Sequence, residues 1–374
     1  MDLNALLLLM AKKQASDLFI TVNKPPCLKI DGQIYPVTAP ALDEQETRKL
    51  VAAAMNDEQQ KRFSAERECN FALQHKNIGR FRVSAFVQKD EPGMVLRLIK
   101  TQIPTIEELN LPPILKQLAM VKRGLVLFAG ATGTGKSTSL AAMIGYRNRE
   151  QAGHIVSIED PIEFVHEHDK AIITQREVGI DTDSYETALR NTLRQAPDVI
   201  LIGEIRTRET MDHAIAFAET GHLCLSTVHA NTAPTTLDRI INFFPQDRRD
   251  QLLLDLSLNL RAVVSQQLLR RADGVGRVPV VEVLLNTPLV ADHIRKGDID
   301  TLRDIMKRST EQGMTTFDKG LYQLYTKGLI TYEDALRYAV SENEVRLMVK
   351  LGENGQLDRM SNEDFQDIQL LRDD

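Results

Sequence analysis

One glycine-rich segment has the residue types and spacing to hold the phosphates of a nucleotide. Residues 130–137 read Gly-Ala-Thr-Gly-Thr-Gly-Lys-Ser, which fits G-x-x-x-x-G-K-[ST] and lies between an apolar run and a helix-forming segment. In such a loop backbone N–H groups surround the phosphates, Lys136 reaches the β- and γ-phosphates, and the Ser137 hydroxyl binds Mg²⁺. A chance match in a flexible turn has odds on the order of one in a hundred.

The sequence therefore predicts a site for ATP and Mg²⁺ at this loop. The residues predicted to bind the nucleotide there are Gly130, Ala131, Thr132, Gly133, Thr134, Gly135, Lys136, Ser137 and Thr138.

Two apolar runs further along the chain end in acidic residues, which such a site needs to orient the attacking water and to hold the metal. The first run leads into Glu159 and Glu163, and the second ends at Gly203 and Glu204. We predict that Ser137 binds Mg²⁺ directly, with Glu163 or Glu204 acting through water. The alternative is a solvated loop carboxylate, which we favour for Glu159 taken alone, although two strand-terminal acids beside a phosphate loop argue against it.

Two histidines, His222 and His229, lie at the two ends of an expected strand. Histidine can hydrogen-bond a γ-phosphate or a coupling carboxylate. A single histidine at a strand end is more often structural, and a zinc site would need further ligands that this spacing does not offer. We expect His166 and His168, in an acidic loop, to be surface residues.

Arginines are candidates because ring ATPases commonly complete a site with an arginine from a neighbouring subunit, worth roughly 10³–10⁵ in rate. For the first part of the chain, a solvated strand face is an equally weighted alternative. The candidates there are Arg80, Arg82 and Arg97, and those that flank the second acidic strand are Arg194, Arg206 and Arg208.

The elements that must position these residues form two parts. Residues 1–100 read as a small α+β domain with an Asp-Gly hairpin over 28–35 and paired strands over 80–87 and 94–99. Residues 101–113 contain three prolines and little apolar periodicity, as expected of a linker.

From residue 114 to 345, apolar strands alternate with helix-length segments, which predicts an α/β domain with a mainly parallel sheet and C-terminal helices after about 286. Residues 346–374 are predicted to be an acidic, loosely packed tail.

Composition narrows the partners and the compartment. The chain has 374 residues, 46 basic and 52 acidic, so its net charge of −6 gives no general attraction for nucleic acid. It has no Trp and 5% aromatic residues, which argues against a single-strand nucleic-acid motor. Three dispersed cysteines suggest neither disulfides nor zinc and fit a reducing cytoplasm. The apolar run at 5–11 is too short for a transmembrane helix.

Together the motifs resemble those of the secretion-type ATPases, and within them the twitching-motility ATPases that retract type IV pili, the PilT/PilU family. The resemblance depends on four motifs in order, and it extends over nearly the whole chain except the tail: the phosphate loop, an acidic box at 157–164, an atypical Walker B segment at 198–206 and a histidine box at 220–231. It implies a PAS-like domain followed by a RecA-like ATPase domain, assembled as a homo-hexamer at the cytoplasmic base of the pilus machine, on the inner membrane.

The resemblance also assigns roles. Glu163 would be the catalytic base, Glu204 the Walker B glutamate, and His222 and His229 the histidine-box residues. Arg80 and Arg82 would contact nucleotide bound between domains or subunits.

Two departures from the family pattern bear on the partners. Thr207 follows Gly-Glu-Ile-Arg where the principal retraction ATPase resembles Gly-Glu-x-Arg-Asp, and residues 289–296 replace the signature A-I-R-N-L-I-R-E. With the acidic tail, these make the accessory PilU branch the closer resemblance. The expected partners are a paralogous retraction ATPase and an inner-membrane platform protein. An accessory docking role with weak hydrolysis, and a pilus-extension or type II secretion ATPase, are the alternatives.

Overall fold

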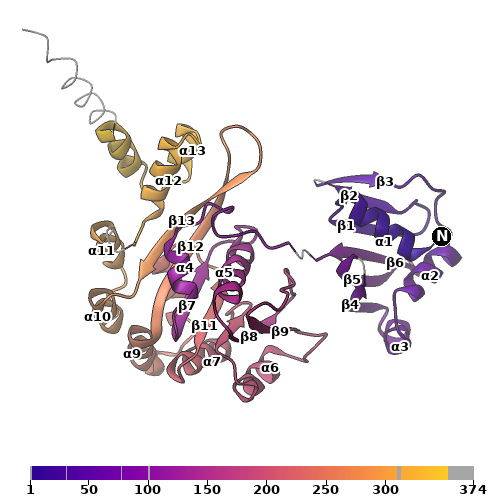
Figure 1. Ribbon diagram of the computed structural model, residues 1–374, viewed down its shortest axis with the longest axis horizontal. Helices are drawn as coiled ribbons and strands as arrows, with labels where there is room; N and C mark the ends of the chain where they lie inside the picture. Colours follow the sequence, from indigo (N-terminus) through magenta and orange to yellow (C-terminus); the bar gives the residue numbers. More distant parts are fainter. Residues whose placement is uncertain (1, 31, 77, 100–101, 310–312, 353–374) are drawn as a thin grey trace, which may run out of the picture.

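Two lobes, each built on its own β-sheet, make up the computed structural model (Figure 1). The structure describes residues 2–30, 32–76, 78–99, 102–309 and 313–352. The N-terminal lobe has a six-stranded sheet and the C-terminal lobe a seven-stranded one. The predicted fold class, an α/β domain preceded by a smaller α+β domain, is confirmed.

Every pairing in the N-terminal sheet is antiparallel, in the order β3-β2-β1-β6-β5-β4. The predicted hairpin is confirmed, because β2 and β3 pair antiparallel with Ile30 opposite Gln33, and Gly32 before β3 has φ +84°. The two strands predicted over 80–87 and 94–99 are β5 and β6. The elements of this lobe are α1 (Leu3–Lys12), β1 (Asp17–Ile20), β2 (Cys27–Ile30), β3 (Gln33–Pro36), α2 (Glu44–Ala53), α3 (Asp57–Glu66), β4 (Glu68–His75), β5 (Gly79–Gln88) and β6 (Glu91–Leu98).

The C-terminal sheet has the order β13-β12-β7-β11-β10-β8-β9, and all its pairs except β12–β13 are parallel. Its strands are β7 (Gly124–Ala129), β8 (Gly153–Glu159), β9 (Ala171–Glu177), β10 (Val199–Ile202), β11 (Leu223–Val228), β12 (Leu260–Arg270) and β13 (Arg277–Leu285). Its helices are α4 (Ile114–Ala119), α5 (Lys136–Glu150), α6 (Tyr185–Thr192), α7 (Arg208–Glu219), α8 (Ala233–Ile241), α9 (Arg249–Asn259), α10 (Pro288–Lys296), α11 (Leu302–Arg308), α12 (Phe317–Thr326) and α13 (Tyr332–Arg337), with short 3₁₀ turns at Leu193–Gln195 and Gln246–Arg248.

The central strands of this sheet are buried on both faces. Every residue of β7, β10 and β11 is buried, and apolar cores lie on either side of the sheet. This explains why these strands read as continuous apolar runs rather than as alternating ones. Because they are parallel and in register, the segments that follow β7, β8, β10 and β11 meet at one edge of the sheet.

The proline-containing segment before α4 packs on the C-terminal lobe over part of its length. Ile106 and Leu111 are 2% and 6% exposed and lie in the same apolar core as Leu115 of α4. None of the helices within the described ranges could span a lipid bilayer.

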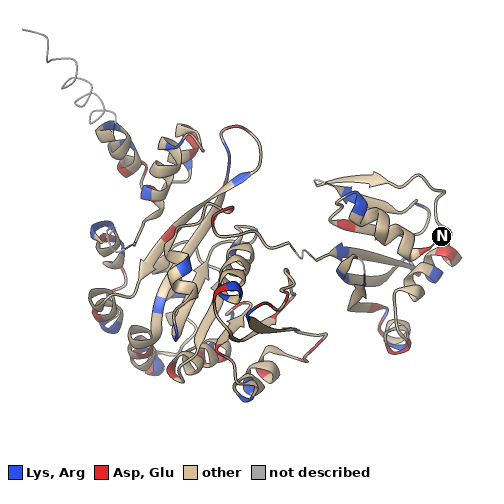
Figure 2. Ribbon diagram, viewed as in Figure 1, with Lys and Arg blue, Asp and Glu red and all other residues tan. Residues whose placement is uncertain are grey.

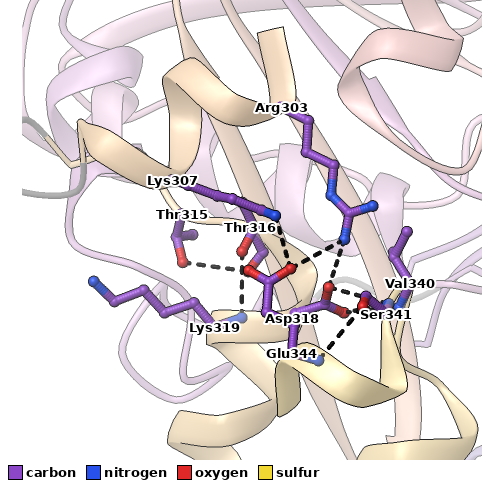
Figure 3. A network of polar contacts seen from close by, with 9 residues as sticks. All are labelled: Arg303, Lys307, Thr315, Thr316, Asp318, Lys319, Val340, Ser341 and Glu344. Atoms are coloured by element: carbon purple, nitrogen blue, oxygen red, sulfur yellow. Dashed lines mark hydrogen bonds and ion pairs between the residues drawn. The ribbon is translucent and has the colours of Figure 1, made fainter. Parts of the chain in front are cut away.

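A buried carboxylate, Asp318, ties the C-terminal helices together (Figure 3). It is 0% exposed, accepts from the backbone N–H groups of Val340 and Ser341, and lies 2.6 Å from Nη2 of Arg303 in α11. Glu344 pairs with Arg303 and with Lys307. We call these residues the C-terminal clamp.

The clamp holds a further helical stretch over residues 342–352, in which Val345 and Val349 are buried. Packed helix therefore extends past residue 345, where the acidic tail was expected to begin. Residues 353–374 of that tail lie outside the described residues.

We expect Asp318→Asn to lower the free energy of unfolding by about 2–3 kcal/mol. Removing one partner of a buried ion pair leaves the other charge uncompensated, and the partial exposure of Arg303 reduces the cost below the full buried value. Asp292→Asn is the matched control, because Asp292 pairs with Lys296 at the surface and its loss should leave the midpoint of unfolding nearly unchanged. Urea denaturation followed by circular dichroism measures both, and equal midpoints for the two variants would contradict the assigned role of the clamp.

Candidate active site

The predicted phosphate loop connects β7 to α5, and its glycines allow the tight path. Gly133 and Gly135 have φ +79° and +87°, in the left-handed region that side chains other than glycine rarely adopt. Helix α5 begins at Lys136, so its amino end faces the loop and offers unpaired N–H groups to an anion.

Lys136 is buried at the centre of this loop. Its Nζ donates to the carbonyl oxygens of Gly130 at 2.7 Å and Ala131 at 2.9 Å. Burial lowers the pKa of its ammonium group, while the nearby carboxylates of Glu204 and Glu163 oppose that shift. The ammonium group of Lys136 therefore lies close to two carboxylates, and a phosphate bound at the loop would be a further negative charge beside it.

A cavity of about 230 Å³ opens at the carboxyl edge of the sheet between this loop and the strands on one side of it. Thr132, Gly133, Lys136 and Ser137 form one wall. The residues of the other walls include Glu159, Asp160, Glu163, Phe164, His166, Tyr185, Gly203, Glu204, Arg206, Thr227 and His229. Of the residues that the sequence selected, this cavity brings together Thr132, Gly133, Lys136, Ser137, Glu163, Glu204, Arg206 and His229.

Glu204 is fixed at the end of β10 by two partners. His229 Nε2 lies 2.8 Å from one carboxylate oxygen, and Arg206 donates to the other from Nε at 2.6 Å. The preceding Gly203 allows close packing, because a Cβ there would lie 2.8 Å from the Tyr185 hydroxyl and 3.2 Å from the Glu159 backbone. The arrangement suits a carboxylate that positions other groups, with His229 joining it to the strand beside the phosphate loop.

Glu163 also lines the cavity, but its carboxylate is exposed and has no hydrogen bond or ion pair to any described residue. It follows β8 in the loop that contains Pro161 and Ile162. Of the three glutamates here, Glu163 is the one whose two carboxylate oxygens are both without a partner among the described residues and so available to a water molecule.

Glu159 is not the solvated loop carboxylate that the sequence favoured. It is the last residue of β8, and it accepts hydrogen bonds from Ser157 Oγ at 2.7 Å and Gln175 Nε2 at 3.2 Å. Burial raises its pKa to about 7, although both hydrogen bonds oppose the shift. Near neutral pH a substantial fraction of this side chain is therefore protonated. Sequence reasoning missed this environment because Gln175, one of the two hydrogen-bond partners, comes from the neighbouring strand β9.

The two histidines at the ends of β11, His222 and His229, lie in different parts of the lobe. His229 lies in the cavity, whereas His222 precedes the other end of β11, roughly 20 Å away by strand rise. Nδ1 of His222 lies 3.1 Å from Thr220 Oγ1 and 3.2 Å from the carbonyl oxygen of Phe217. The chain therefore does not bring His222 to the site of its own phosphate loop.

His166, expected at the surface, instead lines the cavity and is half-buried. Burial lowers its pKa to about 4, so the ring is neutral at physiological pH. His168 is exposed, as expected, and its Nδ1 accepts from the backbone N–H of Ile173.

Two arginines of the N-terminal lobe, Arg82 and Arg97, line a second hollow of about 290 Å³ with Thr138 and Glu163 on its far side. Arg97 also pairs with the buried Asp17 at 2.7 Å. Arg80 lines neither hollow. Its guanidinium lies instead 3.9 Å from the Glu177 carboxylate and 3.6 Å from the Asp181 carboxylate, both in the C-terminal lobe. Arg82 and Arg97 thus approach the acidic box, while Arg80 faces carboxylates.

The other arginine candidates differ in position. Arg206 is the partner of Glu204, but Arg208 pairs with Asp212 along α7 and stacks over Phe244. Arg194 belongs to the 3₁₀ turn after α6 and does not line the cavity.

The residues present fit a magnesium ion bound chiefly by a nucleotide. Mg²⁺ prefers oxygen ligands and keeps several waters, and it is usually held by one or two protein oxygens together with substrate phosphates. The Ser137 hydroxyl and the Glu204 carboxylate face the same cavity. No group of three or more His, Cys, Asp or Glu residues forms a ready-made metal site in the part of the chain that the structure places.

Comparison with known proteins gives consistent results. A family model described as type II/IV secretion system protein matches residues 1–366. The type IV pilus ATPase PilU of Pseudomonas aeruginosa is 63% identical over 96% of this chain and 94% of its own length. The type IV pilus retraction ATPase PilT of the same organism is 40% identical over 92% of this chain and all of its own length. The predicted resemblance, closer to PilU than to PilT, is confirmed.

Solved structures agree with these relatives. A crystal structure of the pilus retraction motor PilT with bound ADP has a TM-score of 0.86 at 37% identity, and covers 92% of this chain and 99% of that one. The ATPase DotB of Legionella pneumophila has a TM-score of 0.77 at 25% identity over 90% of this chain and 95% of its own.

Proposed function

The chain belongs to the type II/IV secretion system protein family and is a retraction-type ATPase of type IV pili; on this premise we propose that it is an ATP-hydrolysing subunit of a hexameric motor that drives pilus retraction. One observation carries the proposal. The phosphate loop with Lys136 and Ser137 faces Glu163, Glu204 and His229 across a single cavity.

Binding would use the loop and the start of α5. The backbone N–H groups would surround the β-phosphate, Lys136 would move from its carbonyl partners to the phosphate oxygens, and Ser137 would hold Mg²⁺. When bound, Mg²⁺ neutralises charge that develops on the phosphates.

Hydrolysis would divide the remaining work between two glutamates. Glu163, whose oxygens are free, would accept a proton from the attacking water. Glu204 would orient the water, and its contact with His229 would link its position to the presence or absence of the γ-phosphate. Arg82 and Arg97, from the same subunit's N-terminal lobe or a neighbour's, would complete the site when the lobes close.

The proposed location is the cytoplasmic side of the inner membrane at the base of the pilus machine. There the chain would contact a platform protein and a paralogous retraction ATPase. The PilU-like departures at Thr207 and residues 289–296 favour a second candidate, an accessory subunit that docks on that paralogue and hydrolyses ATP weakly. Basic and acidic residues are interspersed along the ribbon of both lobes in Figure 2, and we propose no nucleic-acid partner.

The purified chain tests the proposal through its ATPase rate and its mass in solution, measured together. We expect Mg²⁺-dependent phosphate release and, with ATP present, a mass about six times the 42.1 kDa of one chain by light scattering. A rate that rises only after addition of the paralogous ATPase supports the accessory role. A monomer with no phosphate release under either condition contradicts both candidates.

A further inference from the structure

A buried glutamine on the strand next to β7 touches both ends of the phosphate loop. Gln266 is 2% exposed and follows directly after Ser265, which is paired with Ala129 at the last position of the β12–β7 ladder. Its Nε2 donates to the carbonyl oxygen of Thr134 at 2.9 Å, and its Oε1 accepts from Ser139 Oγ at 2.7 Å. One side chain thus links the loop to the first turn of α5.

The hydrogen bond to Thr134 fixes the direction of the next N–H group. The carbonyl of Thr134 and the N–H of Gly135 belong to one planar trans peptide, so they point in opposite directions. Because the carbonyl is drawn toward β12, the N–H of Gly135 points away from β12. In the sheet order β12-β7-β11-β10 that direction leads to the side on which Glu204 and His229 lie.

Close packing of the loop on Gln266 supports the same role. A Cβ at Gly135 would lie 2.8 Å from Gln266 Nε2, and a Cβ at Gly130 would lie 2.6 Å from the Gln266 carbonyl oxygen. The loop therefore lies directly against this residue, and glycine at both positions makes the approach sterically allowed.

We propose that Gln266 is a positioning residue of the nucleotide site, which holds the Thr134–Gly135 peptide so that the Gly135 N–H faces the β-phosphate. The inference rests on the proposed function, since it assumes that the loop binds ATP. Gln266 itself would not touch the nucleotide; it would act through the loop backbone and keep the N–H aligned before the ligand arrives.

Two substitutions separate the hydrogen bonds from the packing. Gln266→Met fills a similar volume but has neither the donor nor the strong acceptor. Gln266→Glu keeps an acceptor for Ser139 and places an oxygen against the Thr134 carbonyl. Gln267→Met is the matched control, being the next residue of the same strand, half-buried and without a side-chain hydrogen bond to any described residue.

The affinity for a fluorescent ADP, MANT-ADP, is measured by titration on the full chain, together with the Tm of the nucleotide-free protein and competition by AMP. We expect Gln266→Met and Gln266→Glu to raise the Kd for MANT-ADP about tenfold, the effect of one misplaced hydrogen bond. Affinity for AMP, which has no β-phosphate, should change less than twofold, and Gln267→Met should bind MANT-ADP like the wild type.

Two results would overturn the assignment. A Kd for Gln266→Met within twofold of the wild type shows that the side chain only fills space. Equal losses for AMP and MANT-ADP, in step with a falling Tm, show general damage to the lobe. If the wild-type chain itself binds no MANT-ADP, the proposed function fails instead, which is a distinguishable outcome.

Discussion

Lys136→Ala is expected to reduce the rate of ATP hydrolysis by at least ~10²–10³-fold, because the variant lacks the charge that faces the transferred phosphate. The side chain is buried and lies between the loop carbonyls of Gly130 and Ala131 and the carboxylates across the cavity. In the substituted protein nothing else in the cavity wall formed by the loop brings a positive charge to this point. Phosphate release from the purified chain measures the effect.

Lys122→Ala is the control for this experiment. Lys122 is exposed and lies just before β7, at the opposite end of the strand from the phosphate loop, so its loss should leave the rate unchanged. The same pair of variants separates the two candidate functions in cells. Loss of retraction in Lys136→Ala with partner binding intact favours the motor, whereas retained retraction favours the accessory docking role. Undiminished phosphate release from purified Lys136→Ala would contradict the assignment of this loop as the site of ATP hydrolysis.

Glu163→Gln is expected to lower kcat by about 10²–10⁴-fold while the Kd for ATP changes only a few-fold. A general base contributes about this much to a rate, and an amide has the same shape but cannot accept the proton of the attacking water. The prediction depends on the free carboxylate of Glu163, in contrast to Glu204, which is held by Arg206 and His229. Steady-state hydrolysis and nucleotide titration together give the two numbers.

Glu167→Gln provides the comparison, since Glu167 is exposed, four residues further along the same loop, and outside the cavity. Its kcat should equal that of the wild type. A near-normal kcat for Glu163→Gln would mean that another carboxylate in the cavity acts as the base. Glu159, whose pKa burial raises to about 7, would then be the next residue to test.

The three glutamates illustrate how environment separates identical side chains. Glu159 is half-buried with its pKa raised to about 7, Glu163 is exposed and has no partner among the described residues, and Glu204 is held between a histidine and an arginine. Carboxylates with such different surroundings can take different parts in one reaction.

Features that depend on neighbouring residues could be predicted from the sequence alone. The phosphate loop, the Asp-Gly hairpin and the apolar central strands were all predicted from short-range patterns. Turn geometry, the start of a helix and the periodicity of buried residues each depend on residues that lie close together in the sequence. Helices α12 and α13, for example, begin just after Thr316 and Thr331, where hydroxyl side chains accept from the first turn. The acids that end β8 and β10 were predicted at the correct edge because parallel strands end together.

Contacts between residues from distant segments became known only from the folded chain. Gln266 was not predicted, because nothing in its own strand shows that β12 lies beside β7. His222 and His229 looked equivalent in sequence, yet the strand between them places only His229 in the cavity. The contact of Glu159 with Gln175 of β9 and the burial of Asp318 depend likewise on other elements. Strand order and side-chain burial are properties of the packed chain as a whole, and contacts between segments far apart in sequence leave no local pattern from which to predict them.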